Sequence, residues 1–300
     1  MRFVTAKKEE KVFVGVVDES FETVLHVREA QKEMTGKVTL PLTMLECVEK
    51  GEAFIEQVVE VVKWAREQKE PKGLYPLSEV KLLAPILRPR KNIMCVGKNY
   101  RDHAIEMGSL NDVPEHLIFF TKAPTTVIGQ QDMIHGYPHL TNELDYEGEL
   151  AVVIGKKGKC ISKEEALDYV FGYTILNDVT ARDIQSRHKQ FFLGKSFDTF
   201  CPMGPFLVHH TMIEKPNDLS IETRVNGEVR QSSHTSHMLF DIPEIISVLS
   251  QGMTLEPGDI IATGTPAGVG KGFKPPRFLK SGDVIDITIE KIGTLTNTVK

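Results

Sequence analysis

The stretch Glu143-Leu144-Asp145-Tyr146-Glu147-Gly148-Glu149-Leu150 alternates an acidic residue with an apolar residue or glycine. In a β-strand, successive side chains point to opposite faces, so the four acids are expected to share one face. Residues 151–154 continue the predicted strand as an apolar run. Four like charges in one row repel one another, and burial increases the repulsion. The row therefore either faces water, as acids on edge strands do, or surrounds a cation.

A cation held by this row would be a hard one, because carboxylate oxygens suit Mg²⁺, Mn²⁺ or Ca²⁺ better than zinc. Glu147 and Glu149 stand at i and i+2 and can reach one ion. A third ligand would come from another strand, and Asp178 is the best candidate because the predicted strand 172–176 ends just before it. From these residues alone, the solvated edge strand and the metal site explain the row equally well.

The composition indicates a chain with a substantial core and gives no sign of a nucleic-acid or membrane partner. Its 300 residues are 41% hydrophobic, enough for one large domain or for a large and a small one. The formal charge of -5 gives no reason to expect nucleic acid or an anionic membrane as a partner. Four widely separated cysteines suit free thiols in a reducing compartment. Without a signal-peptide pattern or a membrane-length apolar run, we expect a soluble, cytoplasmic protein.

The order of local patterns predicts an α+β, β-rich fold in two parts. Residues 1–35 favour short strands, and residues 42–70 favour helix, split in two at Gly51. A proline-bearing segment near residue 88 is expected to close a small α+β N-terminal domain, residues 1–88. Residues 89–300 are expected to form a second, larger domain. There, short strands are separated by glycine and proline, and Asn226-Gly227 marks a hairpin. Helices are expected over 162–169, 183–191 and 241–249.

His103 and Glu106 form a candidate for acid–base chemistry. They follow the predicted strand 93–96 on a short helix, which Asn99 or Asp102 could cap, and their spacing of three places them on one helical face. A carboxylate beside an imidazole orients the ring and raises its basicity, which suits a general base for water. The alternative is an ordinary ion pair on a helix surface, the commoner arrangement for such a spacing.

A further group of residues could hold a substrate carboxylate. If a helix starts after Asp178, Arg182 and Gln185 project from the same side as that acid. Lys195 could add a fixed positive charge, and the backbone and hydroxyl of Thr265, in a glycine-rich loop that fits no P-loop pattern, could grip a small anion. Solvated surface positions are the alternative for each of them.

Five segments together resemble the fumarylacetoacetate hydrolase family, in its bacterial acylpyruvase and oxaloacetate decarboxylase-like branch. They occur in the family's order within residues 92–270, whereas residues 1–85 resemble the variable N-terminal extension of longer bacterial members. The segments are Gly97-Lys98-Asn99-Tyr100-Arg101-Asp102-His103 with Glu106, Asp145-Tyr146-Glu147-Gly148-Glu149-Leu150, Asn177-Asp178-Val179-Thr180-Ala181-Arg182-Asp183, Gly194-Lys195-Ser196-Phe197-Asp198 and Thr263-Gly264-Thr265-Pro266.

The resemblance implies a mixed, β-rich fold with a barrel-like core, usually in homodimers, and it favours the metal site over the solvated strand. It implies Mg²⁺ or Mn²⁺ as the cofactor and a mobile lid helix that carries the acid–base pair. The implied roles are metal ligation by Glu147, Glu149 and Asp178, action on water by His103 and Glu106, an active-site lysine at Lys195, and substrate binding by Arg182, Gln185 and Thr265.

The activity that the resemblance implies is metal-dependent cleavage of the C3–C4 bond of a small 2-oxo acid, which leaves a pyruvate enolate. Oxaloacetate decarboxylation and hydrolysis of an acylpyruvate such as fumarylpyruvate both fit, because the same ligands serve either. Two alternatives remain open: an isomerase or decarboxylase of the 2-hydroxyhepta-2,4-diene-1,7-dioate type, and a non-catalytic metabolite-binding or scaffold protein. We also expect residues 100–115, the lid, to be mobile without ligand.

Overall fold

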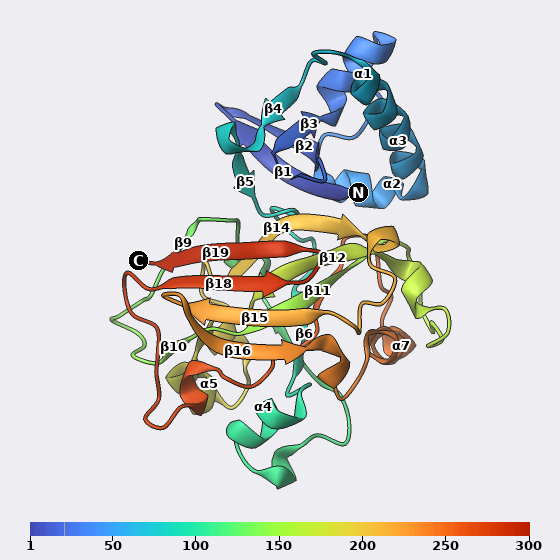
Figure 1. Ribbon diagram of the computed structural model, residues 1–300. Coiled ribbons are helices and arrows are strands. Elements are labelled where there is room, and N and C mark those ends of the chain that lie inside the picture. Colours follow the sequence, from blue (N-terminus) through green and yellow to red (C-terminus); the bar gives the residue numbers. More distant parts are fainter. Residues whose placement is uncertain (21) are drawn as a thin grey trace.

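The computed structural model describes residues 1–20 and 22–300 (Figure 1). Residue 21, which falls in the predicted strand-rich segment 1–35, lies outside the described residues. The fold is α+β and rich in strands, as predicted, although the described strands form open sheets and no closed barrel. No described helix is both long and apolar enough to cross a membrane.

The N-terminal part is a small antiparallel sheet with three helices against one of its faces (Figure 1). The predicted split at Gly51 is confirmed: Thr43 and Glu46 form a capping box at the start of α2, and α3 begins directly after Gly51. The elements are β1 (Arg2–Lys8), β2 (Lys11–Val17), β3 (Thr23–His26), α1 (Val27–Thr35), α2 (Met44–Lys50), α3 (Glu52–Glu67), β4 (Leu74–Pro76), η1 (Leu77–Glu79) and β5 (Lys81–Leu83).

The rest of the chain forms mainly strands. They are β6 (Ile93–Gly97), β7 (Ile118–Lys122), β8 (Val127–Ile128), β9 (Met133–Ile134), β10 (Leu144–Asp145), β11 (Gly148–Ile154), β12 (Val170–Asn177), β13 (Thr180–Ala181), β14 (Cys201–His209), β15 (Ser220–Val225), β16 (Glu228–His234), β17 (Ile260–Ala262), β18 (Val284–Ile289) and β19 (Gly293–Val299). The helices are α4 (Arg101–Glu106), α5 (Arg182–His188), α6 (Phe192–Lys195) and α7 (Ile242–Gly252). Short 3₁₀ turns are η2 (Leu110–Asp112), η3 (Pro124–Thr126), η4 (Ala166–Tyr169), η5 (His210–Met212), η6 (Thr235–His237) and η7 (Gly270–Gly272).

Two sheets pack face to face over the main core. The large sheet runs β4-β3-β2-β1-β14-β12-β11-β17-β6-β7, and the smaller one runs β16-β15-β18-β19-β9 (Figure 1). Side chains alternate along β11: Leu150 and Val152 enter the core shared with the smaller sheet, whereas Ala151 and Val153 face a second core. Both faces of β11 are therefore buried, which accounts for the apolar run at residues 150–154.

The N-terminal part continues the large sheet of the rest of the molecule. β1 pairs antiparallel with β14, and Phe3 of β1 packs against both Phe54 and Phe171, with ring centroids 5.3 and 6.0 Å apart. Phe54 belongs to α3 and Phe171 to β12, so one apolar cluster spans the predicted boundary near residue 88. That boundary stays a prediction, and the two parts share a sheet and a core.

Some local expectations are confirmed and others are wrong. The hairpin at Asn226-Gly227 joins β15 and β16, as predicted, and the four cysteines are free. The expected helix over 162–169 is only the 3₁₀ turn η4. One bond of the expected capping box is present, from the Glu165 N–H to Ser162 Oγ at 3.3 Å, and the Glu165 carboxylate accepts from the Ser162 hydroxyl and not from its backbone N–H. α4 has Tyr100 at its N-cap with no side-chain cap, so neither Asn99 nor Asp102 caps it.

The acidic stretch at residues 143–150 is not one strand. β10 ends at Asp145 and pairs with β13, whereas β11 begins at Gly148 within the large sheet. The chain changes sheets at Tyr146 and Glu147, so the prediction that four acids share one strand face is wrong. Alternation cannot reveal this break, because the residue types on either side of it continue the same pattern.

Candidate active site

Three carboxylates from two neighbouring strands meet at one end of the large sheet. β11 and β12 are antiparallel with Gly148 opposite Asn177, which brings the start of β11 beside the residue after β12. The Asp178 N–H donates to Glu147 O at 2.9 Å, and the Glu147 N–H donates to Asn177 Oδ1 at 3.1 Å. Carboxylate oxygens of Glu147, Glu149 and Asp178 lie within 4.8 Å of one another, and all three side chains are buried. The residues predicted as metal ligands are thus brought together.

Gly148 allows the smaller sheet to approach this cluster. A Cβ at this position would lie 2.4 Å from Thr223 Oγ1, so a side chain would push the sheets apart. The Gly148 N–H donates to Gln231 Oε1 at 3.0 Å. Gln231 is fully buried on β16, and its Nε2 donates to Thr265 Oγ1 at 2.7 Å. One amide side chain thereby fixes both the acidic segment and the Thr265 loop.

Buried cations surround the carboxylates. Lys195 Nζ lies 2.7 Å from Glu147 Oε2 and 2.7 Å from Asp178 Oδ2. Lys122 Nζ lies 2.6 Å from Asp178 Oδ1 and also donates to the Lys195 carbonyl. Arg182 places Nη1 2.7 Å from Glu147 Oε1 and Nε 2.8 Å from Asp145 Oδ2. The solvated edge-strand explanation is therefore wrong, since these acids are buried and paired.

The buried cations pair with Glu147 but leave the Glu149 carboxylate without a cationic partner among the described side chains. Burial would raise the pKa of Glu147, but the Lys195 ammonium and Arg182 guanidinium outweigh burial and hold that pKa below its usual range. Burial, followed by repulsion from Asp178 and Glu147, raises the pKa of Glu149 well above its usual value. The Gly264 N–H donates to Glu149 Oε2 at 2.7 Å, without offsetting this rise.

A hard cation fits this excess of negative charge. Among the described side chains, four buried carboxylates face three buried cations: Asp145, Glu147, Glu149 and Asp178 against Lys122, Arg182 and Lys195. An all-oxygen set of Glu147, Glu149 and Asp178 suits Mg²⁺ or Mn²⁺. With a dication bound and all four carboxylates ionised, the group would carry one net positive charge and so favour an anionic substrate.

The other two acids of the stretch have different surroundings. Asp145 is fully buried: besides pairing with Arg182, it accepts hydrogen bonds from the Gly270 and Lys271 N–H groups at 2.7 and 3.0 Å. It therefore supports Arg182 and the glycine-rich loop and does not face solvent. Glu143 is half-buried, and its carbonyl accepts from the Arg182 N–H at 3.0 Å.

α4 lies beside the cluster and carries the predicted acid–base pair. His103 is buried, and its Nδ1 lies 2.9 Å from Glu106 Oε1. The Gly268 N–H also donates to the Glu106 carboxylate, at 3.1 and 3.0 Å to its two oxygens. The surface ion-pair alternative is wrong for this pair. The segment 108–112 forms a capped turn in which Ser109 N–H donates to Asp112 Oδ2 at 2.8 Å.

A cavity of about 420 Å³ lies between α4, α5 and the carboxylates. Arg182, Gln185, Lys195 and Thr265 line it, so the predicted substrate-binding residues are brought together. The helix expected over 183–191 is present as α5, which begins at Arg182 and ends at His188, and Gln185 Oε1 accepts from Arg182 Nη1 at 3.3 Å. Arg182 Nη2 is buried and has no hydrogen-bond partner among the described residues. In this conformation the Thr265 hydroxyl donates to Gly148 O at 3.0 Å, so its proton is not free for a substrate.

Two residues that matter here were not predicted from the sequence. Lys122 stands at the end of β7 and Gln231 in the middle of β16, and neither belongs to a segment with an acidic or glycine-rich pattern. A lysine in the strand segment Ile118–Lys122 was the only available signal for the first. The positions of both depend on tertiary packing.

Comparison with known proteins agrees with this geometry. The family model described as fumarylacetoacetate (FAA) hydrolase C-terminal matches residues 92–300. The oxaloacetate tautomerase YisK of Bacillus subtilis is 56% identical over 301 residues, covering 100% of both chains.

Solved structures of related proteins have the same fold. A fumarylacetoacetate hydrolase from Exiguobacterium antarcticum superposes with a TM-score of 0.82 at 43% identity, covering 100% of this chain and 99% of the other. A 2-hydroxyhepta-2,4-diene-1,7-dioate isomerase from Mycobacterium marinum gives 0.74 at 35% identity, covering 100% and 98%. Solved structures named as a hydrolase and as an isomerase thus share this architecture.

Proposed function

Because this chain belongs to the fumarylacetoacetate hydrolase family, we propose that it is a divalent-metal-dependent enzyme that forms an enol or enolate from oxaloacetate. The observation that carries the proposal is the charge of the cavity. Its lining includes five cationic side chains and only one carboxylate, that of Glu147; the cations are Lys98, Arg182, Lys189, Lys195 and Lys271. Such a lining suits a small dianion, and the Bacillus relative is named for oxaloacetate.

Glu147, Glu149 and Asp178 would hold Mg²⁺ or Mn²⁺, which when bound supplies a Lewis acid that polarises the 2-oxo group. Glu147 and Asp178 raise the pKa of Lys195 despite its burial, so it is an ammonium group and not a base. It therefore stabilises negative charge on the substrate oxygens. The unpartnered Arg182 Nη2 offers a further donor to a carboxylate.

His103 moves the proton. In the keto-to-enol direction its ring nitrogen removes a proton from C3, the C–H electron pair forms the C2–C3 double bond, and the oxygen on C2 takes up the charge and then a proton. The reverse direction returns the proton to C3. Glu106 positions His103 through Nδ1, which leaves Nε2 for this transfer. No oxidant or second substrate is needed.

Cleavage of the C3–C4 bond is the second candidate, and the His103–Glu106 pair favours it too. In decarboxylation the C3–C4 electron pair forms the C2–C3 double bond as CO₂ leaves, and a proton from His103 then gives pyruvate. In hydrolysis of an acylpyruvate the same pair would activate water for attack at C4. The tautomerase activity named for the relative was not among the reactions expected from the sequence.

The proposal is tested by following enol-oxaloacetate absorbance and pyruvate release separately, with Mg²⁺ or Mn²⁺ present. Accelerated enol loss without pyruvate identifies a tautomerase, and pyruvate from oxaloacetate identifies a decarboxylase. Pyruvate from acetylpyruvate or fumarylpyruvate alone would move the assignment to hydrolysis. Acceleration of none of these, with metal bound, would contradict the proposal and favour an isomerase or a metabolite-binding protein.

We also infer a homodimer in solution, on the basis of family membership alone. Light scattering should give about twice the chain mass of 33.6 kDa. A monomer mass at the concentrations used for the assay would contradict it.

A further inference from the structure

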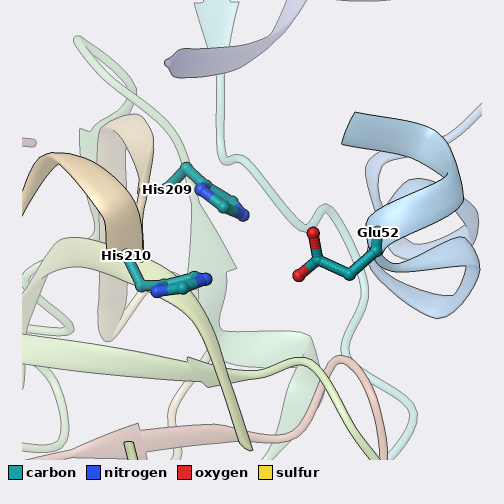
Figure 2. A group of neighbouring side chains, drawn as sticks. All are labelled: Glu52, His209 and His210. Carbon is teal, nitrogen blue, oxygen red and sulfur yellow. The ribbon is translucent and has the colours of Figure 1, made fainter. Parts of the chain in front are cut away.

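Two imidazoles and a carboxylate converge far from the catalytic cavity, at the junction of the two parts of the molecule (Figure 2). Glu52 is the first residue of α3, in the N-terminal part. His209 ends β14 and His210 begins η5, in the rest of the molecule. Their ligand atoms lie within 4.8 Å of one another, and Figure 2 shows both rings and the carboxylate turned toward a common space.

The local contacts orient these groups. His209 Nδ1 is hydrogen-bonded to Thr211 Oγ1 at 2.9 Å, which leaves Nε2 free. The His209 N–H donates to Met1 O at 3.0 Å and fixes the backbone beside β1. An oriented imidazole with its second nitrogen hydrogen-bonded is the usual arrangement of a histidine that binds a metal.

The remaining two groups have free binding capacity. Across residues 1–20 and 22–300, the structure shows no hydrogen bond or ion pair from the Glu52 carboxylate or the His210 ring. The ring centroids of His209 and His210 lie 4.4 Å apart, so the two imidazoles lie side by side next to the Glu52 carboxylate.

We propose that Glu52, His209 and His210 bind one Zn²⁺ ion that ties α3 to the end of β14. Two imidazole nitrogens and one carboxylate oxygen form a borderline donor set, which suits zinc better than Mg²⁺. This distinguishes the site from the all-oxygen cluster of Glu147, Glu149 and Asp178. Water would complete a four-coordinate site, since Glu52 is exposed.

The consequence is structural. The three ligands come from segments separated by more than 150 residues, so the ion would close a long loop and join the N-terminal helices to the strand next to β12. An ion that binds the folded chain and not the unfolded chain stabilises it by mass action. At free Zn²⁺ about 100-fold above Kd, Tm should rise by about 5 °C.

The test uses the full chain, stripped with a chelator and held in saturating Mg²⁺ so that the carboxylate cluster is filled. Zn²⁺ is then titrated calorimetrically, and crystals soaked in Zn²⁺ are measured at its absorption edge. We expect one Zn²⁺ per chain, with an anomalous peak between the three side chains. Glu52→Gln and His210→Ala should each weaken binding at least about tenfold.

The matched controls are Glu56→Gln, one turn further along α3, and His139→Ala, on an exposed loop. Both should bind Zn²⁺ as tightly as the unaltered chain and show the same rise in Tm. No retained Zn²⁺, or binding unaffected by Glu52→Gln and His210→Ala, would overturn the proposal. Glu52 lies on the surface, so its variant is expected to fold, and circular dichroism checks this. Oxaloacetate turnover plays no part in these readouts, so the proposal is independent of the proposed activity.

Discussion

Lys122 holds the charge balance of the site without lining its cavity. Its ammonium group is fully buried and pairs with Asp178 Oδ1, so its removal leaves that buried oxygen unpaired and Lys195 as the remaining cation beside Asp178. We expect Lys122→Met to lower the free energy of unfolding by about 3–5 kcal/mol in metal-free protein, as measured by urea denaturation. Added Mg²⁺ should recover part of that loss by compensating Asp178.

Lys81→Met is the matched control for this experiment. Lys81 also pairs with an aspartate, with its Nζ 2.6 Å from Asp132 Oδ1, but its side chain is 55% exposed. The loss there should be about 1 kcal/mol or less. Equal losses in the two variants would show that the buried pair has no special importance.

The reactivity of the four cysteines toward a thiol reagent tests how they are buried. Burial raises the pKa of Cys47 to about 12 and that of Cys201 to about 12, and it raises the pKa of Cys95 well above its usual value, whereas Cys160 is exposed. A thiol reagent at pH 8 should therefore label one cysteine in native protein and four after unfolding. Labelling of two or more in the native state would contradict the packing.

The same thiols link stability to alkaline pH. Their folded-state pKa values lie above the unfolded value near 9, so only the unfolded chain loses these protons as pH rises above 9. Stability should therefore be unaffected by these groups below pH 9 and should fall from there toward pH 12. Replacing Cys47 and Cys201 by Ala should flatten that slope, as measured by urea denaturation at several pH values.

At the scale of elements, α4 is attached to the glycine-rich loop through Glu106. The carboxylate accepts from the Gly268 N–H while it orients His103. A Cβ at Gly268 would lie 1.9 Å from Arg230 O, and the residue has φ +104°, so this loop has little freedom to adjust. The predicted mobility of residues 100–115 therefore requires, among other changes, release of the Glu106 side chain from this loop.

We expect Glu106→Ala to speed amide exchange across residues 101–112 and to reduce kcat for oxaloacetate by about tenfold to a thousandfold. The loss should be smaller than that of His103→Ala, since Glu106 acts through the imidazole. Glu115→Ala, at the exposed last position of the lid and outside the segment 101–112, is the control and should change neither quantity. Unchanged exchange in Glu106→Ala would show that something else holds the lid closed.

At the scale of the molecule, the two parts are expected to unfold together. β1 lies in the same sheet as β14, and Phe3 contacts both Phe54 and Phe171. The single tryptophan, Trp64 on α3, reports the N-terminal part, and turnover reports the catalytic part. Both signals should be lost at one urea midpoint. Phe3→Ala should lower the free energy of unfolding by about 3–5 kcal/mol and shift the midpoint of both signals together to lower urea. A tryptophan transition that clearly precedes the loss of turnover would contradict this.

Much of the fold follows from local signals. The helix split depends on Gly51 and the hairpin on Asn226-Gly227, and each signal operates within a few residues. The break between β10 and β11 does not follow, because alternation continues through Tyr146 and Glu147 while the chain changes sheets. Strand pairing decides that break, and pairing partners lie far away in the sequence.

In the candidate site, too, some residues could be predicted from local patterns and others could not. Glu147, Glu149 and Asp178 could be predicted because strand spacing and a strand end bring them together. Lys122, Gln231 and the pairing of Arg182 with Asp145 could not, because each connects segments far apart in sequence.

We propose that Glu147, Glu149 and Asp178 hold the divalent cation on which turnover depends. The most direct test of this proposal is the rate of enol-oxaloacetate ketonisation by chelator-stripped protein, before and after addition of Mg²⁺ or Mn²⁺, in the unaltered chain and in Glu149→Gln. Without metal the raised pKa of Glu149 favours its neutral form, which glutamine imitates, so the variant should fold. We expect no acceleration without metal, full recovery with it, and no recovery in Glu149→Gln. Full activity in stripped protein, or normal metal-dependent activity in Glu149→Gln, would show that these carboxylates do not hold a cation that turnover requires.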